Sequence, residues 1–182
     1  MINAIGLLEL NSIAEGIHTA DLMMKSAEVS LLTAKPCCPG KYIILISGAV
    51  EAVSTSLNTG IQSGKEYVID STFIPRVHED VIRAISAMSN PECTGALGVM
   101  EFFSVAWAIQ GADAAVKASN IELIEIRLGI GIGGKSFVTL SGDVSAVHNS
   151  VQAGIHQAAK EGMLINHTIV PHPRKEIYAQ LL

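Results

Sequence analysis

The chain opens with an alternation of apolar runs and helical stripes. The mainly apolar run from Ala4 to Leu10 is typical of a buried strand. Val29 to Ala34 and Tyr42 to Ile46 indicate the two strands of a hairpin, separated by a loop that contains proline and glycine. Between the first two strands, apolar residues recur at spacings of 3, 4 and 3, which predicts a helix whose buried face is Ile17, Ala20, Met24 and Ala27.

A second helical stripe and a last strand complete the pattern. The stripe steps by 3, 4 and 4 through Val50, Val53, Leu57 and Ile61. Tyr67 to Ile74 is the expected last strand, and a short helix is expected from Glu79 to Met88. The order β-α-β-β-α-β predicts a ferredoxin-like α+β fold, a sheet with helices on one side. That fold carries many functions and does not decide among them.

The whole pattern occurs twice, with a two-residue insertion in one loop of the second copy. At an offset of 92 the second copy repeats Ala4, Gly6, Glu9, Ser12, Ala14, Ile17, Ala20, Asp21, Lys25 and Leu31. At an offset of 94 it repeats Gly40, Lys41, Ser47, Gly48, Val50, Ala52, Val53, Ser56 and Gly60. Its second helical stripe is Val144, Val147, Val151 and Ile155. We expect two tandem domains, residues 1–90 and 95–182, joined by a polar, turn-rich linker from Ser89 to Gly95.

The amino-acid composition limits the classes of partner that the chain is expected to bind. Of the 182 residues, 49% are hydrophobic and only 16% are charged, which suggests that surplus apolar surface lies in subunit interfaces. No apolar run approaches the ~20 residues of a membrane helix, so no membrane is expected. The net charge is −5 with scattered Lys and Arg, which argues against nucleic acid. The first residues carry no secretion signal pattern, and three cysteines form no disulfide framework, so a reducing cytosol is expected.

Three repeated motifs carry a family resemblance. Each copy opens with Ala-x-Gly-x-x-Glu, starting at Ala4 and Ala96. Each first helix holds Ala-Asp-x-x-x-Lys, ending at Lys25 and Lys117. Each hairpin runs Gly-Lys, strand, Ser-Gly, then a helix with Val-x-x-Val. Over nearly the whole chain, these motifs resemble the shell-protein domain of bacterial microcompartments in tandem form.

Within that family the run Cys38-Pro39-Gly40-Lys41 resembles the PduT type, the iron–sulfur-bearing shell protein of propanediol-utilisation compartments. The resemblance implies a homotrimer that forms a flat pseudo-hexameric tile with a central pore. It implies a place in the microcompartment shell, in the cytoplasm, with other shell proteins as neighbours and a lumenal flavin- or cobalamin-linked redox enzyme as a partner. It also implies that Lys25, Lys117 and Arg76 lie at the tile edge.

The loop expected to face the pore differs between the copies. The first copy contributes Cys38, Pro39 and Gly40, and the second contributes Gly131, Gly133 and Gly134. Because an iron–sulfur cluster needs about four ligands, one local thiolate cannot cage it, whereas a three-fold axis brings three copies of one cysteine together. We therefore expect a [4Fe–4S] cluster shared by three subunits, with Cys38 as the metal ligand that matches the family motif. Neighbouring side chains of extended chain point to opposite faces, so Cys37 is expected to pack locally.

Other candidate chemistry is weak. Gly129 to Gly134 formally matches G-x-G-x-x-G, but the dinucleotide motif opens a helix, whereas this one runs into an expected strand. The six histidines have no metal spacing, and no catalytic acid–base pair or nucleophile constellation is apparent, so no enzymatic activity is expected. Two alternatives stay open beside the cluster-bearing tile. One is a metal-free tile whose pore passes small metabolites, and the other is a regulatory trimer that binds a small molecule.

Overall fold

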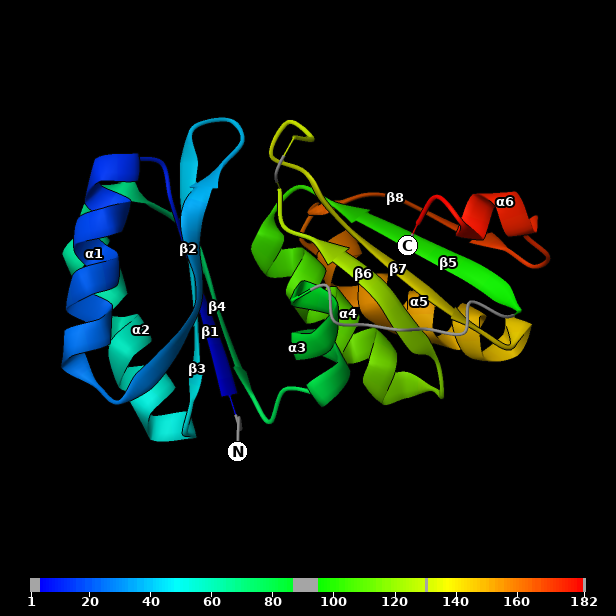
Figure 1. Cartoon of the computed structure of the whole chain (residues 1–182), viewed down its shortest axis with the longest axis horizontal. Helices are drawn as coiled ribbons and strands as arrows, with labels where there is room; N and C mark the ends of the chain where they lie inside the picture. The colour runs from blue at the N-terminus through cyan, green and yellow to red at the C-terminus, as the bar shows by residue number, and fades with distance from the viewer. Residues whose placement is uncertain (1–3, 87–94, 130, 182) are drawn as a thin grey trace. The chain divides into compact units, whose positions relative to one another are not determined.

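The computed structural model describes residues 4–86, 95–129 and 131–181 (Figure 1). The chain divides into two compact units. The first consists of residues 1–77 with 130–134, and the second of residues 78–129 with 135–182.

The first unit is one antiparallel sheet with two helices on it. The elements are β1 (Ala4–Leu10), α1 (Ile13–Ser26), β2 (Val29–Cys37), β3 (Lys41–Gly48), α2 (Val50–Gly64), the 3₁₀ turn η1 (Lys65–Tyr67) and β4 (Val68–Pro75). The strand order is β2-β3-β1-β4, so the hairpin strands β2 and β3 pair with each other and β3 pairs with β1. This order and the antiparallel pairing are those of the ferredoxin-like fold.

The second unit repeats that architecture. Its elements are α3 (Glu79–Ile85), β5 (Ala96–Phe102), α4 (Val105–Ala118), β6 (Glu122–Arg127), β7 (Ser136–Gly142), α5 (Val144–Lys160), β8 (Leu164–Val170) and α6 (Lys175–Tyr178). The strand order is β6-β7-β5-β8, the counterpart of the first sheet. The expected α+β fold with two tandem copies of β-α-β-β-α-β is confirmed.

The helix α3 lies with the second unit, although it follows the first repeat in sequence. It packs against β6 and α4. The first domain was expected to run to residue 90, whereas the main segment of the first unit ends at Val77. The linker from Ser89 to Gly95 falls almost entirely outside the described residues, which resume at Gly95.

The first helix shows how sequence signals and packing differ. Ser12 is the N-cap of α1, and its hydroxyl accepts a hydrogen bond from the Glu15 N–H at 3.3 Å, which satisfies one of the helix's free donors. The expected buried stripe is confirmed at Ala20, and Met24 packs against the core, but Ile17 is wrong. The buried residues are Gly16, Thr19, Ala20 and Met23, whereas Ile17 is 56% exposed. Gly60 of α2 lets Met23 approach, since a Cβ there would lie 2.5 Å from the Met23 sulfur.

The core of the first unit lies between its sheet and helices. Its buried members are Ala4, Leu8, Leu10, Ala20, Met23, Tyr42, Ile44, Ile46, Val53 and Leu57. Fully burying a side chain of the Leu or Ile kind stabilises a fold by roughly 1.5–3 kcal/mol. β1 is buried along its whole length, including Glu9.

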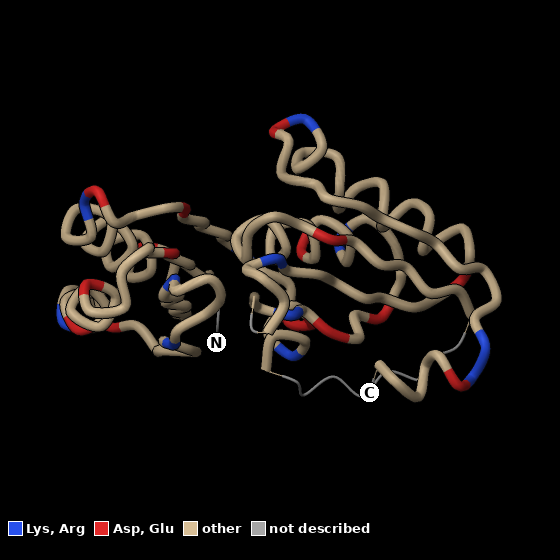
Figure 2. The backbone as a smooth tube through the Cα atoms, turned by 90° about the horizontal axis from the view of Figure 1, so that it is seen from above, with Lys and Arg blue, Asp and Glu red and all other residues tan. Residues whose placement is uncertain are grey.

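No helix in the described part of the chain combines the length and apolar character needed to cross a bilayer. Lys and Arg are dispersed along the chain rather than gathered in one stripe (Figure 2).

Candidate metal centre in the β2–β3 hairpin

The β2–β3 hairpin carries Cys37 and Cys38 at its tip. β2 extends to Cys37, and Cys37 pairs with Lys41 as the last register position before the turn. The turn is Cys38-Pro39-Gly40, with a cis peptide bond between Cys38 and Pro39. Gly40 has φ +84°, a left-handed conformation that favours glycine, and its N–H donates to the Cys37 carbonyl at 3.1 Å. The turn therefore places Cys38 beyond the end of the paired strands.

The two cysteine thiols have different environments. Cys37 is buried, and burial raises the pKa of its thiol to about 11, with the Glu9 carboxylate adding to the rise and the Lys41 ammonium opposing it. At neutral pH this thiol is protonated. The thiolate is the form that binds metals, so Cys37 is poorly suited as a ligand.

Cys38 is a free thiol and is only partly buried. Its neighbours in the turn, Pro39 and Gly40, are exposed, and open space surrounds the position that a Cβ would take on Gly40. Cys38 can therefore meet ligands from outside its own chain. Cys93 lies outside the described residues.

A charge pair that sequence reasoning did not find lies behind the hairpin. The Lys41 ammonium donates to a Glu9 carboxylate oxygen at 3.3 Å, and the two side chains are 18% and 1% exposed. Glu9 is on β1 and Lys41 begins β3, so the pair joins the hairpin to the central strand. Glu9 and Lys41 both belong to motifs that are repeated in each copy, and this repetition was the signal in the sequence that could have pointed to them. Their contact depends on the β1–β3 register, which composition does not reveal.

The glycine-rich segment after β6 adopts left-handed backbone conformations, which glycine favours. Gly129, Gly131, Gly133 and Gly134 all have φ between +66° and +81°, and the segment continues into the strand β7. Residues 130–134 belong to the first unit, where a Cβ on Gly134 would lie 2.7 Å from the Cys38 carbonyl oxygen. This segment does not open a helix, so it lacks the context of the dinucleotide motif. Ile130 is not among the described residues.

The residues expected at the tile edge differ in their surroundings. Lys25 pairs with Asp21 at 2.6 Å, and the two side chains are 70% and 55% exposed. Lys117 pairs with Asp113, whose side chain is only 11% exposed. Arg76 is exposed after Pro75 and has φ +56°.

The metal-binding side chains that the structure describes suit a cluster shared between copies of the chain rather than a site within one chain. Among the described residues, no group of three or more His, Cys, Asp or Glu side chains is placed to hold a metal ion. Of the two cysteines that the structure describes, Cys38 is the accessible one, and its place at the end of a hairpin meets the requirement for a ligand that several copies supply together. A thiolate is the protein ligand that iron–sulfur clusters use, so the residues present fit this group.

The second unit also contains a half-open cavity of about 370 Å³. Its lining consists of Gly95, Asn120, Ile121, Glu122, Ser141, Gly142 and Asp143. Two of these residues are acidic, and none of the lining residues is Lys or Arg. Among the described residues, the lining therefore presents no Lys or Arg side chain to an anionic ligand.

The duplicated fold and motifs agree with a known domain family. The BMC domain matches residues 4–77 and 96–173, which is both repeats. This chain belongs to the BMC-domain family. It is 40% identical to the bacterial microcompartment shell protein PduT of Citrobacter freundii, over 100% of this chain and 99% of that protein.

Two further proteins are similar to this chain over most of its length. A crystal structure of a microcompartment protein from Desulfitobacterium hafniense DCB superposes with a TM-score of 0.93, at 48% identity over 98% of this chain and 99% of that one. The carboxysome assembly protein CcmO of Synechococcus elongatus is 26% identical over 98% of this chain and 68% of its own length. The chain is therefore a structural shell protein with two BMC domains, and its place is the microcompartment shell, as the resemblance implied. Its relatives are named as shell and assembly proteins, not as enzymes.

Proposed function

We propose that this shell protein forms a homotrimeric, pseudo-hexameric tile whose central pore holds a [4Fe–4S] cluster on the Cys38 thiolates of three copies. The observation that carries the proposal is the contrast between the two neighbouring thiols. Cys38 is accessible at the tip of the hairpin, whereas Cys37 is buried and protonated. One ligand per chain is the arrangement that a three-fold axis turns into a binding site.

The chain's own residues hold and shape this site. The Pro39-Gly40 turn presents the thiol, and the Glu9–Lys41 pair fixes the base of the hairpin against β1. Gly131, Gly133 and Gly134 have backbone conformations that permit a compact loop near the same turn, which supports a role for them in lining the pore. When bound, such a cluster supplies one-electron transfer. The tile would then pass electrons across the shell or deliver a cluster, with a lumenal flavin- or cobalamin-linked redox enzyme as its partner.

The test is iron and sulfide analysis of protein purified without oxygen. Wild-type protein is expected to be coloured and to hold about four irons for every three chains. Cys38→Ser is expected to lose both the colour and the iron. The matched control is Cys37→Ser, which changes the adjacent thiol and is expected to keep most of the iron.

A colourless wild-type protein after reconstitution with iron and sulfide would contradict the cluster. The function would then be that of a metal-free tile whose pore passes small metabolites. Equal loss of iron in Cys37→Ser and Cys38→Ser would contradict the assignment of Cys38 as the ligand.

The proposed tile also needs lateral contacts with other shell proteins. Lys25 supports this role because its side chain is 70% exposed and is paired only to the exposed Asp21 among the contacts described. Replacing Lys25 and Lys117 by alanine together is expected to leave the trimer intact and to impair sheet formation in electron micrographs. Normal sheets from the double variant would contradict the tile-edge role.

A further inference from the structure

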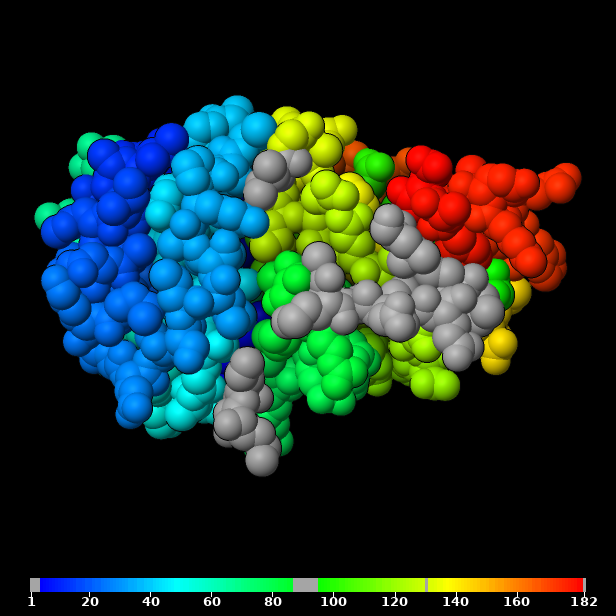
Figure 3. Space-filling view, viewed as in Figure 1, coloured from blue at the N-terminus to red at the C-terminus, as the bar shows by residue number. Residues whose placement is uncertain are grey.

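The β2–β3 hairpin is positively charged, although the chain as a whole is acidic. Over residues 29–48 the charged side chains are Lys35 and Lys41, whereas the whole chain has a net charge of −5. The Lys41 ammonium is compensated by the buried Glu9 carboxylate at 3.3 Å. Figure 3 shows the tip of this hairpin at the surface, in light blue at the top of the view. Lys35 therefore decides the net charge of the segment that carries Cys38.

Lys35 lies on the edge strand β2, two residues before Cys37, and is half-buried. Its register partner is Ile43 on β3, and Ile43 is also the partner of Glu9 on β1. Residues opposite one another in a sheet share a face, so Lys35 is on the same face as Glu9 but two strands away, at roughly 10 Å. Burial raises the pKa of the Cys37 thiol to about 11, and the Lys35 ammonium is one of the charges that oppose this rise. The field of Lys35 therefore reaches the end of the hairpin.

The second repeat neutralises the cation at the equivalent position. Arg127 on β6 stands at the offset of 92 from Lys35, and both strands shift register at the same distance before it. The Arg127 guanidinium pairs with the Glu125 carboxylate at 2.5 Å. The counterpart of Glu125 in the first repeat is Thr33, whose hydroxyl carries no charge. The repeats therefore differ in whether this cation is compensated, and the uncompensated one is in the repeat that contains the cysteines.

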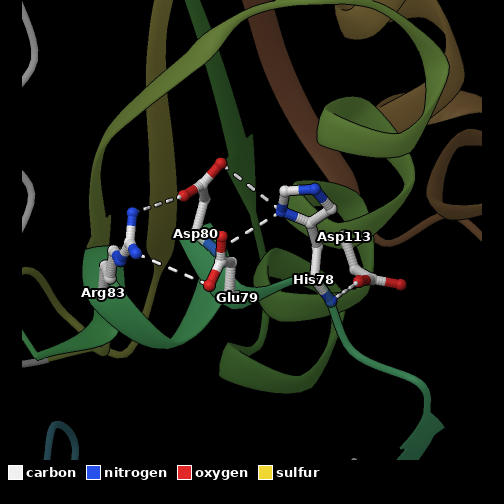
Figure 4. A network of polar contacts seen from close by, with 5 residues as sticks. All are labelled: His78, Glu79, Asp80, Arg83 and Asp113. Carbon is white, nitrogen blue, oxygen red and sulfur yellow. Dashed lines mark hydrogen bonds and ion pairs between the residues drawn. The ribbon is translucent and has the colours of Figure 1, made fainter.

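Cations elsewhere in the described part of the chain also have carboxylates beside them. The Arg83 guanidinium donates to Asp80 at 3.4 Å and to Glu79 at 3.5 Å, as Figure 4 shows. Among the described residues, no such ion pair joins Lys35 to a carboxylate. An unneutralised ammonium therefore lies on the same hairpin as Cys38, three residues before it.

We infer that the Lys35 ammonium sets the reduction potential of the cluster proposed on Cys38 by stabilising its reduced state. Each thiolate ligand brings a negative charge, and reduction adds one electron from an external one-electron donor without making or breaking a bond. The reduced site is the more anionic one, so a nearby cation favours it. In the proposed trimer each thiolate has its own Lys35 on the same hairpin. The inference rests on the proposed function, because it needs the cluster.

The experiment is a redox titration of protein reconstituted with iron and sulfide, reduced stepwise with dithionite under argon and followed by visible absorbance. Lys35→Met removes the charge. Thr33→Glu leaves Lys35 in place and adds the carboxylate that the second repeat has beside Arg127. Both variants are expected to shift the midpoint potential to more negative values than wild type. Lys35→Arg keeps the charge and is expected to retain the wild-type potential.

The matched control is Glu28→Gln, which removes an exposed charge directly before β2. Glu28 is separated from Cys37 by the length of that strand, roughly 30 Å. This exceeds the Debye length of about 8 Å at physiological ionic strength, so the control is expected to titrate as wild type. Iron content is measured for every variant before its titration, so that loss of the cluster is not mistaken for a shift in potential.

The possible outcomes separate this inference from the proposed function. A wild-type potential in iron-loaded Lys35→Met and Thr33→Glu would overturn the role of Lys35 and leave the cluster in place. An equal shift in Lys35→Arg and Lys35→Met would show that the charge is not the cause, which also overturns the inference. Wild-type protein that binds no iron would overturn the cluster and this inference with it. If Lys35→Met fails to fold, the potential of Thr33→Glu decides.

Discussion

The buried Glu9–Lys41 pair leads to a sharp prediction about stability. Lys41→Met keeps the length of the side chain and removes its charge, which leaves the Glu9 carboxylate, 1% exposed, without the ammonium at 3.3 Å. Removing one partner of a buried pair typically costs about 3–5 kcal/mol, because the remaining charge loses that favourable interaction in the interior. Lys41 is 18% exposed, so water reaches part of the pair. We therefore expect the free energy of unfolding to fall by about 2–4 kcal/mol.

The assay is urea unfolding at one chain concentration, because assembly contributes to the measured stability. The matched control is Lys135→Met, which changes the equivalent lysine of the second repeat, an exposed residue, and is expected to cost less than about 0.5 kcal/mol. Adding Glu9→Gln to Lys41→Met is expected to recover part of the loss, since an amide needs no counter-charge. A Lys41→Met effect as small as that of Lys135→Met, or no recovery in the double variant, would refute the reasoning.

Three further predictions concern the free energy of unfolding when single residues are replaced. The pKa of Cys37 is raised from 9.0 to about 11, so the folded state holds this proton more tightly, and its contribution is present below pH 9 and is lost as the pH rises to about 11. The unfolding free energy of wild type should therefore fall across this window by about 1–3 kcal/mol more than that of Cys37→Ala, and parallel profiles for the two proteins would contradict this. Gly60→Ala should lower the unfolding free energy by about 1–3 kcal/mol, because its Cβ would lie 2.5 Å from the Met23 sulfur, and an unchanged urea midpoint would argue against that packing. Ser12→Ala should cost about 0.5–2 kcal/mol in the same assay and Ser12→Asp should cost much less, whereas equal losses would remove the capping role.

The sequence by itself determined the features that depend on local pattern. The duplication and the strand and helix order follow from repeated motifs and from periodicity, which neighbouring residues specify. The alternation of side chains along extended chain indicated that Cys37 and Cys38 do not face the same axis, and the resemblance to the family motif then favoured Cys38. The burial of Cys37 agrees with that choice. The sequence also predicted that the glycine-rich segment is followed by a strand rather than by a helix.

Only the tertiary structure decided which apolar face is covered and which distant residues meet. The prediction that Ile17 is buried was wrong because both Ile17 and Met23 suit a buried face, and the choice depends on how α2 packs through Gly60. The Glu9–Lys41 pair needs the β1–β3 register, and α3 lies with the second unit because β6 and α4 offer it a surface there. These contacts join residues far apart in the chain, and the free energy that selects them comes from packing that no local pattern encodes.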